Sequence, residues 1–298
     1  MNGVRMPIVF RNLFLVLAMT VSSSSTAGPH KSFDKRATIS HAQAKSIYNK
    51  FALEGHIGGN DASSNYGGPA VKALVSMAAF ASDEDNELRQ GMEQTQPLNV
   101  FDFGCGQGKL AEHIISTMPT GLTKRKIFWH GVDQSPEMIT KFQQRMAIVK
   151  KNVKKDTLFN FSSYLMKESG DPQQLFDITP RKHYHRFVST YCLDLLSETD
   201  IYSVLDLAEH CLHPTEGKLL LAGITFGYKD SIRTFCTTLL WEITYKLRPR
   251  IVGGCRPQIL SQYLDERGWK IEKLERTMPV GFPWMSSEVI CARPPPPT

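Results

Sequence analysis

The sequence has no C-x-x-C pair and no internal repeat. Six cysteines are spread singly along its 298 residues, which excludes a disulfide framework and a zinc module. The absence of a repeat excludes solenoids and propellers. Cys105 and Cys192 lie in apolar strand patterns, where buried and reduced thiols are expected. The cysteines therefore favour a reducing compartment, and 41% hydrophobic with 21% charged residues is an ordinary globular composition.

Excess positive charge is scarce outside the first residues. The formal net charge is +6, but the first 36 residues hold five basic side chains against one acid. The rest of the chain carries only +2, which gives no strong signal for nucleic acid binding. Histidine pairs occur at His183 and His185 and at His210 and His213, without a third ligand in register. No metal site is predicted from them.

Long hydrophobic runs are also missing. The apolar run Asn12–Val21 is too short to cross a bilayer, which takes roughly 20 residues, so no transmembrane span is predicted. Arg5 and Arg11 precede this run, and serines and a small-residue site near Ala27 follow it. These features suit either a secretory signal or an organelle transit peptide. We expect residues 1–37 to be a cleaved targeting segment on an otherwise cytoplasmic-type, reduced protein.

Strand and helix patterns alternate from residue 98 onward. Apolar strand patterns occur at 98–104, 126–133, 157–165, 185–196 and 217–227, with helical patterns at 108–118, 135–151 and 197–212 between them. This alternation predicts right-handed βαβ units in a Rossmann-like, doubly wound α/β sheet with helices on both faces. Two closing strands, 270–278 and 287–293, break the rhythm, and we expect the last strand to be antiparallel.

A glycine-rich turn follows the first strand of this alternation. Its glycines, Gly104, Gly106 and Gly108, are spaced G-x-G-x-G. The dinucleotide fingerprint G-x-G-x-x-G is excluded because Lys109 stands where its third glycine belongs. The phosphate loop G-x-x-x-x-G-K-[ST] is absent as well. What remains is a strand with Asp102 near its end, a turn of alternating glycines and a helix.

This arrangement, an aspartate among apolar residues followed by G-x-G-x-G, resembles motif I of the class I S-adenosylmethionine-dependent methyltransferases. The resemblance implies S-adenosyl-L-methionine as the cofactor, held by Asp102, Gly104, Cys105, Gly106 and Gly108. Glycine leaves the backbone open to the aminoacyl end of this cofactor, and an acid nearby suits its ammonium and sulfonium charges. The stretches FVSTYCLDLLS, LRPRIVGGCRP and SEVICAR resemble a type-11 subgroup of the family.

The second match to the family is Asp133, at the end of the second strand. An acid in this position can accept both ribose hydroxyls of an adenosine, and Gln134 beside it can reach the adenine edge. Family members often carry an acid after the third strand that meets the adenine amine. This chain has NFSSYL there, which leaves Ser162 or Ser163 to take its place.

In this family the residues after the fourth strand line the cleft between cofactor and substrate. Thr190 is expected to contact the cofactor, and Tyr191 and Asp194 are candidate catalytic groups. A polar residue that caps the following helix explains them equally well. Tyr48, on the first helix, is a further candidate. No general base is assigned, because an acceptor that ionises readily needs none.

We expect the methyl acceptor to be small and partly hydrophobic. The helix pattern at 231–247 is apolar and aromatic, and it either shapes the acceptor pocket or packs as an ordinary core helix. Three arginines follow it, Arg248, Arg250 and Arg256. They either bind an acidic group of the substrate or are surface charges.

The function expected from these features is methyl transfer from S-adenosylmethionine to a small molecule by in-line displacement. The alternatives are an RNA or protein methyltransferase and a catalytically silent cofactor-binding scaffold. The methyltransferase domain is expected to span residues 38–293. It comprises a helical cap at 38–97, a cofactor-binding core at 98–227, and a substrate-side insertion with closing strands at 228–293, and residues 294–298 form a tail. The sequence indicates no oligomeric state.

Overall fold

The structure is a computed structural model that describes residues 39–54, 68–78, 97–117, 126–152, 159–167, 170–180, 182–226, 232–277 and 286–296. All of them belong to one unit, Lys35–Thr298. The expected targeting segment, residues 1–37, lies outside the described residues. Within the described part of the chain, no helix is both long and apolar enough to cross a membrane.

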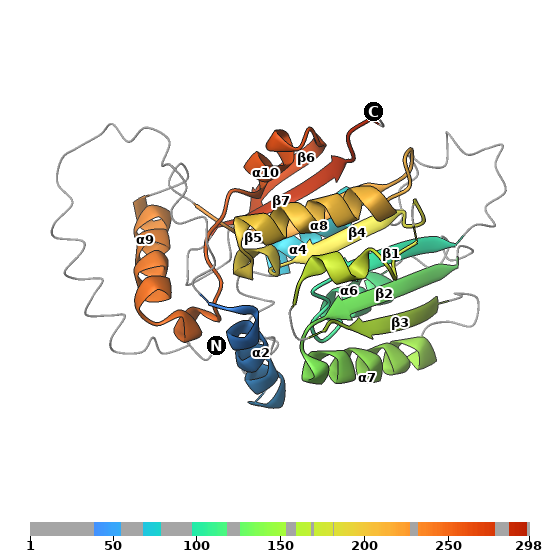
Figure 1. The fold of residues 1–298 in the computed structure, drawn as a ribbon, viewed down its shortest axis with the longest axis horizontal. Coiled ribbons are helices and arrows are strands. Elements are labelled where there is room, and N and C mark those ends of the chain that lie inside the picture. Colours follow the sequence, from blue (N-terminus) through green and yellow to red (C-terminus); the bar gives the residue numbers. More distant parts are fainter. Residues whose placement is uncertain are drawn as a thin grey trace. The chain divides into compact units, whose positions relative to one another are not determined.

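A seven-stranded sheet lies at the centre of this unit, in the order β3-β2-β1-β4-β5-β7-β6 (Figure 1). The strands are β1 (Leu98–Phe103), β2 (Ile127–Asp133), β3 (Phe159–Leu165), β4 (Arg186–Thr190), β5 (Lys218–Thr225), β6 (Lys270–Thr277) and β7 (Ser286–Arg293). Strands β1 to β5 are parallel, and β7 is antiparallel to both β5 and β6. The predicted doubly wound sheet with an antiparallel last strand is confirmed.

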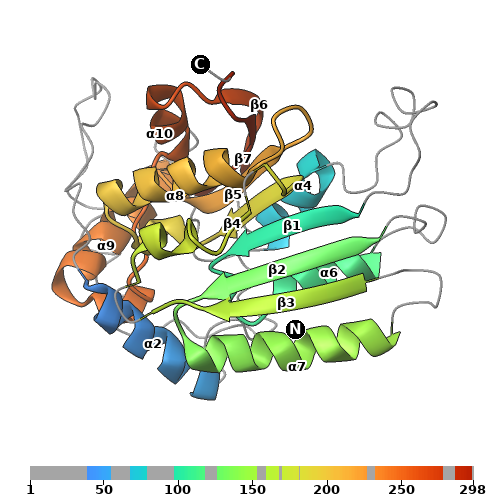
Figure 2. The ribbon, with the colours of Figure 1, turned by 45° about the vertical axis from the view of Figure 1, so that its right-hand side comes forward.

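Helices cover both faces of the sheet (Figure 2). They are α2 (His41–Glu54), α4 (Gly68–Ala78), α6 (Lys109–Thr117), α7 (Pro136–Asn152), α8 (Glu198–Cys211), α9 (Ile232–Leu247) and α10 (Leu260–Glu266). Residues of α4, α6 and α7 pack in one hydrophobic core and those of α8 and α10 in another. Neighbouring residues of β1 divide between them: Val100 joins the first core and Phe101 the second, because successive side chains point to opposite faces.

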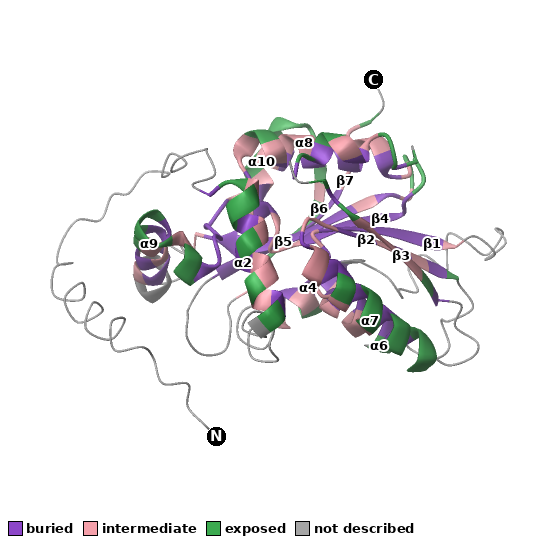
Figure 3. Ribbon diagram, turned by 60° about the horizontal axis from the view of Figure 1, so that its bottom comes forward, coloured by how far each residue is buried: buried purple, intermediate pink, exposed green. Residues whose placement is uncertain are grey.

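The central strands are buried on both faces, as Figure 3 shows. All six residues of β1 and seven of the eight in β5 are buried. Near-continuous apolar runs are therefore the correct signal for these strands, since a parallel sheet is covered by helices on each side. The first and fourth strands are neighbours although they are far apart in sequence. Chain order reverses between them, and ligands bind at such a switch point, beyond the carboxyl ends of the strands.

The sequence also specifies where α8 begins. The Ser197 side chain accepts from the Asp200 backbone amide, while the Asp200 side chain accepts from the Ser197 amide at 3.3 Å. This is a reciprocal capping box, in which two amides that lack helical partners are both satisfied. Buried residues of α8, including Ile201, Val204 and Leu205, then hold the helix on the sheet.

The capping box gives a stability prediction. Replacement of the cap, Ser197→Ala, lowers the free energy of unfolding by about 1 kcal/mol. The corresponding fall in melting temperature is about 2–4 °C for a domain of this size. Ser116→Ala, at an exposed position of α6, is the matched control and leaves the melting temperature nearly unchanged. Equal shifts in the two variants would show that the cap contributes nothing.

Candidate functional site

A cavity of about 270 Å³ opens beyond the carboxyl ends of β1, β2 and β4. It is lined from the first turn by Asp102, Gly104, Cys105 and Gly106, and from elsewhere by Asp133, Gln134, Thr190, Tyr191 and Tyr48. The structure thus brings together most of the residues that the sequence singles out. Gly108 and Asp194 are not part of the lining. The cavity lies at the switch point of the sheet, where the fold places ligands.

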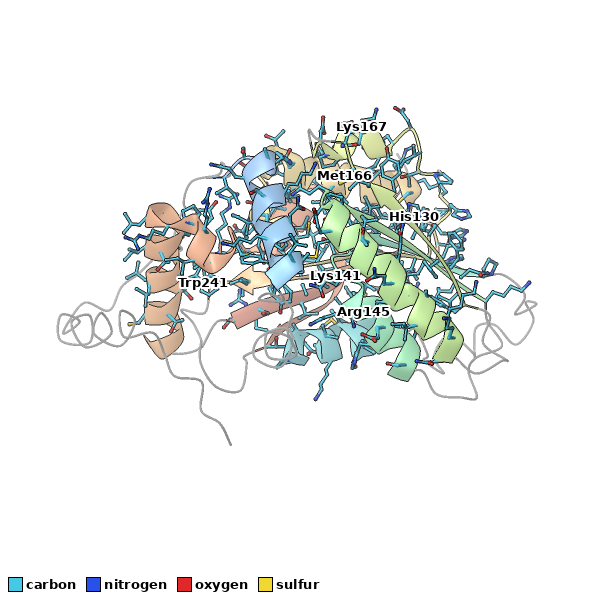
Figure 4. The ribbon with its side chains drawn as sticks, turned by 90° about the horizontal axis from the view of Figure 1, so that it is seen from below. His130, Lys141, Arg145, Met166, Lys167 and Trp241 are labelled. Atoms are coloured by element: carbon cyan, nitrogen blue, oxygen red, sulfur yellow. The ribbon has the colours of Figure 1, made fainter. Side chains whose placement is uncertain are left out.

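The glycine turn is shaped by two different requirements. A Cβ on Gly104 would lie 2.4 Å from the Cys192 sulfur, so this glycine permits a close approach between the turns after β1 and β4. Gly106 has a φ of 50°, and no atom lies within 4 Å of where its Cβ would be. It therefore leaves open backbone beside the cavity. From α7, Arg145 donates to the carbonyl of Gln107 at 2.8 Å and fixes the far side of the turn (Figure 4).

Asp102 lies at the base of the cavity and is almost fully buried, with 2% of its surface exposed. Its Oδ2 accepts a hydrogen bond of 2.9 Å from the indole Nε1 of Trp129 on β2. Burial raises the pKa of Asp102 to about 7, and the indole hydrogen bond opposes that rise. A cation bound nearby would favour the charged form of this carboxylate.

Asp133 ends β2 and ties the glycine turn to the next helix. Its Oδ2 accepts from the Gly106 amide at 3.0 Å, and its Oδ1 accepts from the Ser135 amide at 2.8 Å. Burial raises the pKa of Asp133 to about 6, against the effect of these hydrogen bonds. The Gln134 backbone amide also interacts with this carboxylate. A carboxylate offers about four acceptor positions, so part of its acceptor capacity remains. The hydroxyls of a sugar are donors of the kind that this capacity suits.

The serines expected to meet an adenine do not line the cavity. Ser162 and Ser163 lie within β3, paired with His130 and Gly131 of β2, rather than after the strand. The Ser162 hydroxyl hydrogen-bonds His130 at 2.6 Å, and Ser163 accepts from Gln143 at 2.8 Å. This expectation was wrong because both hydroxyls are used within the sheet and its covering helix. The first residues beyond β3 line the cavity instead, beginning with the Met166 side chain (Figure 4).

Tyr191 is held in an unusual backbone conformation at the cavity wall. Its φ is 51°, in the left-handed region that residues other than glycine seldom adopt. Its amide donates to the Ala222 carbonyl at 2.7 Å, and its hydroxyl hydrogen-bonds Ser287 at 2.9 Å. Strain of this kind persists where surrounding structure enforces it, and it is frequent at functional sites. Thr190, the last residue of β4, lines the cavity beside it.

Asp194 lies behind the cavity rather than in it. It is completely buried, and its Oδ2 accepts from the Ile224 amide of β5 at 2.9 Å. Burial raises the pKa of Asp194 to about 8. Its backbone carbonyl accepts from the Arg256 amide, and the Arg256 guanidinium donates to the Leu196 carbonyl at 2.8 Å. Arg256 is therefore buried and structural, neither a surface charge nor a group in the cavity lining.

A further wall of the cavity comes from α2 and from η4 (Pro249–Val252) with the residues after it. The Tyr48 hydroxyl lies 3.6 Å from the Cys255 sulfur, and Val252 adds apolar surface. No described side chain of α9 belongs to the lining, contrary to one of our two expectations for that helix. Trp241 of α9 instead donates to the Cys255 carbonyl at 2.9 Å, so α9 supports the wall from outside (Figure 4).

One polar pair at the cavity escaped the sequence analysis. His41 lines the cavity, and its Nε2 lies 3.3 Å from Asp200 Oδ2 on α8. A Cβ placed on Gly170 would lie 2.3 Å from His41 Nδ1 and 2.9 Å from Gln134 Oε1, so the imidazole and this amide converge on one point. A capping box of Ser40 and Gln43 begins α2. Nothing in the sequence, however, shows that His41 has a partner 159 residues away.

The histidine pairs have structural contacts. His185 accepts from the Asn99 amide at 3.1 Å, and His213 accepts from the Glu216 amide at 3.2 Å. No group of three or more His, Cys, Asp or Glu side chains in the described ranges is arranged to hold a metal ion.

The ion pair of His41 and Asp200 gives a pH prediction. Their hydrogen bond raises the pKa of His41 above 6.5 and lowers the pKa of Asp200 below 3.8. The ion pair therefore stabilises the folded protein fully between pH 3.8 and pH 6.5. This stabilisation is lost as the pH rises through the raised pKa of His41. We expect His41→Gln to lower the free energy of unfolding by about 1 kcal/mol near pH 6, and by almost nothing near pH 9.

Urea denaturation across that pH range measures the difference. His183→Gln is the matched control, because His183 is exposed. Its free energy of unfolding should follow that of the wild-type protein at every pH. A deficit in His41→Gln that stays constant with pH would contradict a charged pair.

No family model matches the chain, and no curated protein matches it either. Among solved structures, the [4+2]-cyclase SpnF has a TM-score of 0.53 and 14% identity over 88% of this chain and 99% of its own. A SAM-dependent methyltransferase from Leishmania major has a TM-score of 0.50 and 12% identity over 85% of this chain and 82% of its own.

These similarities concern the fold, because identity is low and one neighbour carries the name of a cyclase. The chain has the Rossmann-like fold of the class I S-adenosylmethionine-dependent methyltransferases.

Proposed function

We propose that this protein is a methyltransferase that uses S-adenosylmethionine and acts on a small, partly hydrophobic molecule. The observation that carries the proposal is the convergence of three groups on one cavity. The open backbone at Gly106, the buried carboxylate of Asp102 and the carboxylate of Asp133 all line it. Each comes from the edge of the sheet where this fold binds ligands.

The residues at the cavity fit the cofactor. Gly106 offers backbone without a side chain to an aminoacyl group, and Asp102 offers negative charge to an ammonium or sulfonium. Asp133 has remaining acceptor capacity for ribose hydroxyls. Gln134 and His41 supply polar groups at the same end of the cavity. S-adenosylmethionine, when bound, supplies a methyl group activated by its positive sulfur.

The wall that α2 and η4 contribute supports the proposal of a partly hydrophobic acceptor. Its lining includes the aliphatic side chains of Ile39, Leu195 and Val252. The Tyr48 hydroxyl, beside the Cys255 thiol, is a polar group that can orient an acceptor there. Orientation and exclusion of water supply much of the acceleration in an in-line displacement. This wall therefore positions the acceptor, and the buried Asp194 takes no part in proton transfer.

Two other functions are separated from this one by experiment. An RNA or protein methyltransferase would need a binding surface for a macromolecule, whereas the groups described here converge on one cavity of about 270 Å³. A silent scaffold would bind the cofactor without transferring methyl. Binding and transfer are accordingly measured in turn.

Calorimetric titration with S-adenosylhomocysteine tests the binding step. Asp133→Ala should weaken binding about 100-fold, because two hydrogen bonds to a charged group are lost. Asp133→Asn keeps the shape of the side chain and guards against a folding defect, and it should also bind more weakly. Asp265→Ala, on the exposed side of α10, should bind as the wild-type protein does. An absence of binding by the folded wild-type protein would refute the proposal.

Transfer of a labelled methyl group tests the reaction. Wild-type protein is incubated with labelled S-adenosylmethionine and with a cell extract separated into small-molecule, RNA and protein fractions. We expect label in the small-molecule fraction, and at least about 10-fold less with Asp133→Ala. Label confined to RNA or protein would contradict the small-molecule acceptor. Cofactor binding without any labelled product would favour the silent scaffold.

A further inference from the structure

Exposed aliphatic and basic side chains gather on one surface of α9 and η4. We define this α9–η4 surface by Ile243, Lys246, Leu247, Arg248, Arg250 and Ile251, all of them exposed. Leu247 is 76% exposed, Ile251 55% and Ile243 38%. In Figures 1 and 3, α9 lies at the outer edge of the ribbon, with exposed segments on its outward side.

The clustering sets this surface apart from other exposed aliphatic residues. Leu53, Ile148, Leu165, Ile178 and Leu274 are exposed singly, each on a different segment. Isolated residues of this kind are normal on soluble proteins and need no explanation. Three exposed aliphatic side chains within nine residues are a different situation, because Ile243 and Leu247 lie one turn apart on α9 and Ile251 follows in η4, which makes an apolar strip along one short segment.

The charge around this strip has one sign. Lys246, Arg248 and Arg250 lie among the aliphatic residues. The one acid in the sequence from Ile232 to Arg256 is Glu242, and it is only 8% exposed. The surface therefore presents aliphatic side chains framed by the basic side chains of Lys246, Arg248 and Arg250. An apolar strip flanked by Lys and Arg is the pattern of helices that lie in the headgroup region of a bilayer.

The surface is continuous with the cavity wall. Ile251 precedes Val252, which lines the cavity together with Gly253 and Cys255. The Gly254 amide donates to the Pro249 carbonyl at 2.8 Å, which holds this segment as one tight turn. The outer and inner sides of the same short segment therefore face the surroundings and the cavity.

We propose that the α9–η4 surface docks the protein on a bilayer that contains anionic phospholipid. The aliphatic side chains insert among the headgroups, and the three basic side chains contact lipid phosphate and carboxylate groups. Docking is peripheral. A consequence that rests on the proposed function is that the methyl acceptor is a lipid-soluble molecule, which reaches the cavity past Val252.

Co-sedimentation with vesicles tests the docking. The full chain is mixed with vesicles of phosphatidylcholine alone, or with phosphatidylserine in place of about a third of it. We expect binding to the anionic vesicles that weakens as salt is raised. The variant Leu247→Gln/Arg248→Gln/Arg250→Gln should bind them at least about 30-fold more weakly, from the loss of two charges alone. All three side chains are exposed, so the melting temperature should not change.

The matched control is Ile148→Gln/Lys150→Gln/Lys151→Gln on α7, which removes one exposed aliphatic and two exposed basic side chains. It should bind vesicles as the wild-type protein does. Equal losses in both triple variants, or no preference for anionic vesicles, would overturn the proposal. So would a lipid-free dimer, seen by analytical ultracentrifugation, that Leu247→Gln dissociates. The assay contains no methyl donor, so its failure leaves the proposed function standing.

Discussion

The hydrogen bonds of Asp133 hold the candidate site together. One carboxylate joins the Gly106 amide, in the turn after β1, to the Ser135 amide that precedes α7. Two segments that are 27 residues apart are thereby fixed at one edge of the sheet. Because Asp133 also lines the cavity, the group that orders the glycine turn is also the one that we propose for binding the ribose. Structure and recognition depend on one side chain.

Much of the fold follows from local patterns in the sequence. Buried parallel strands are continuous apolar runs, and α8 is specified by its Ser197 capping box. The glycine turn and Asp133 could be assigned because the chemistry of the site is concentrated in short segments that follow strands. Parallel strands bring such segments to one edge automatically. The adenine end could not be assigned, since the strand pattern at 157–165 does not reveal that His130 and Gln143 occupy the hydroxyls of Ser162 and Ser163.

The features that sequence reasoning missed depend on distant contacts. His41 lies at the cavity because α2 packs across α7 and reaches Asp200 on α8. Arg256 is buried because its partners are the backbone carbonyls of Asp194 and Leu196 on the turn after β4, about 60 residues earlier. The place of α9 could not be predicted for a similar reason. Its Trp241 supports the cavity wall from outside and does not line it. A helical pattern indicates which face is apolar but not which element that face will meet.

The close approach of Gly104 to Cys192 links two positions that are far apart in the chain. With 2.4 Å between the cysteine sulfur and the place of a Cβ on Gly104, the two residues share a fixed volume. Any gain of atoms at one position must be matched by a loss at the other. The two positions should therefore vary together among descendants of this sequence, and position 104 should stay glycine for as long as position 192 is cysteine or larger. A thiol on the turn after β4 can in this way constrain which sequences keep the glycine on the turn after β1.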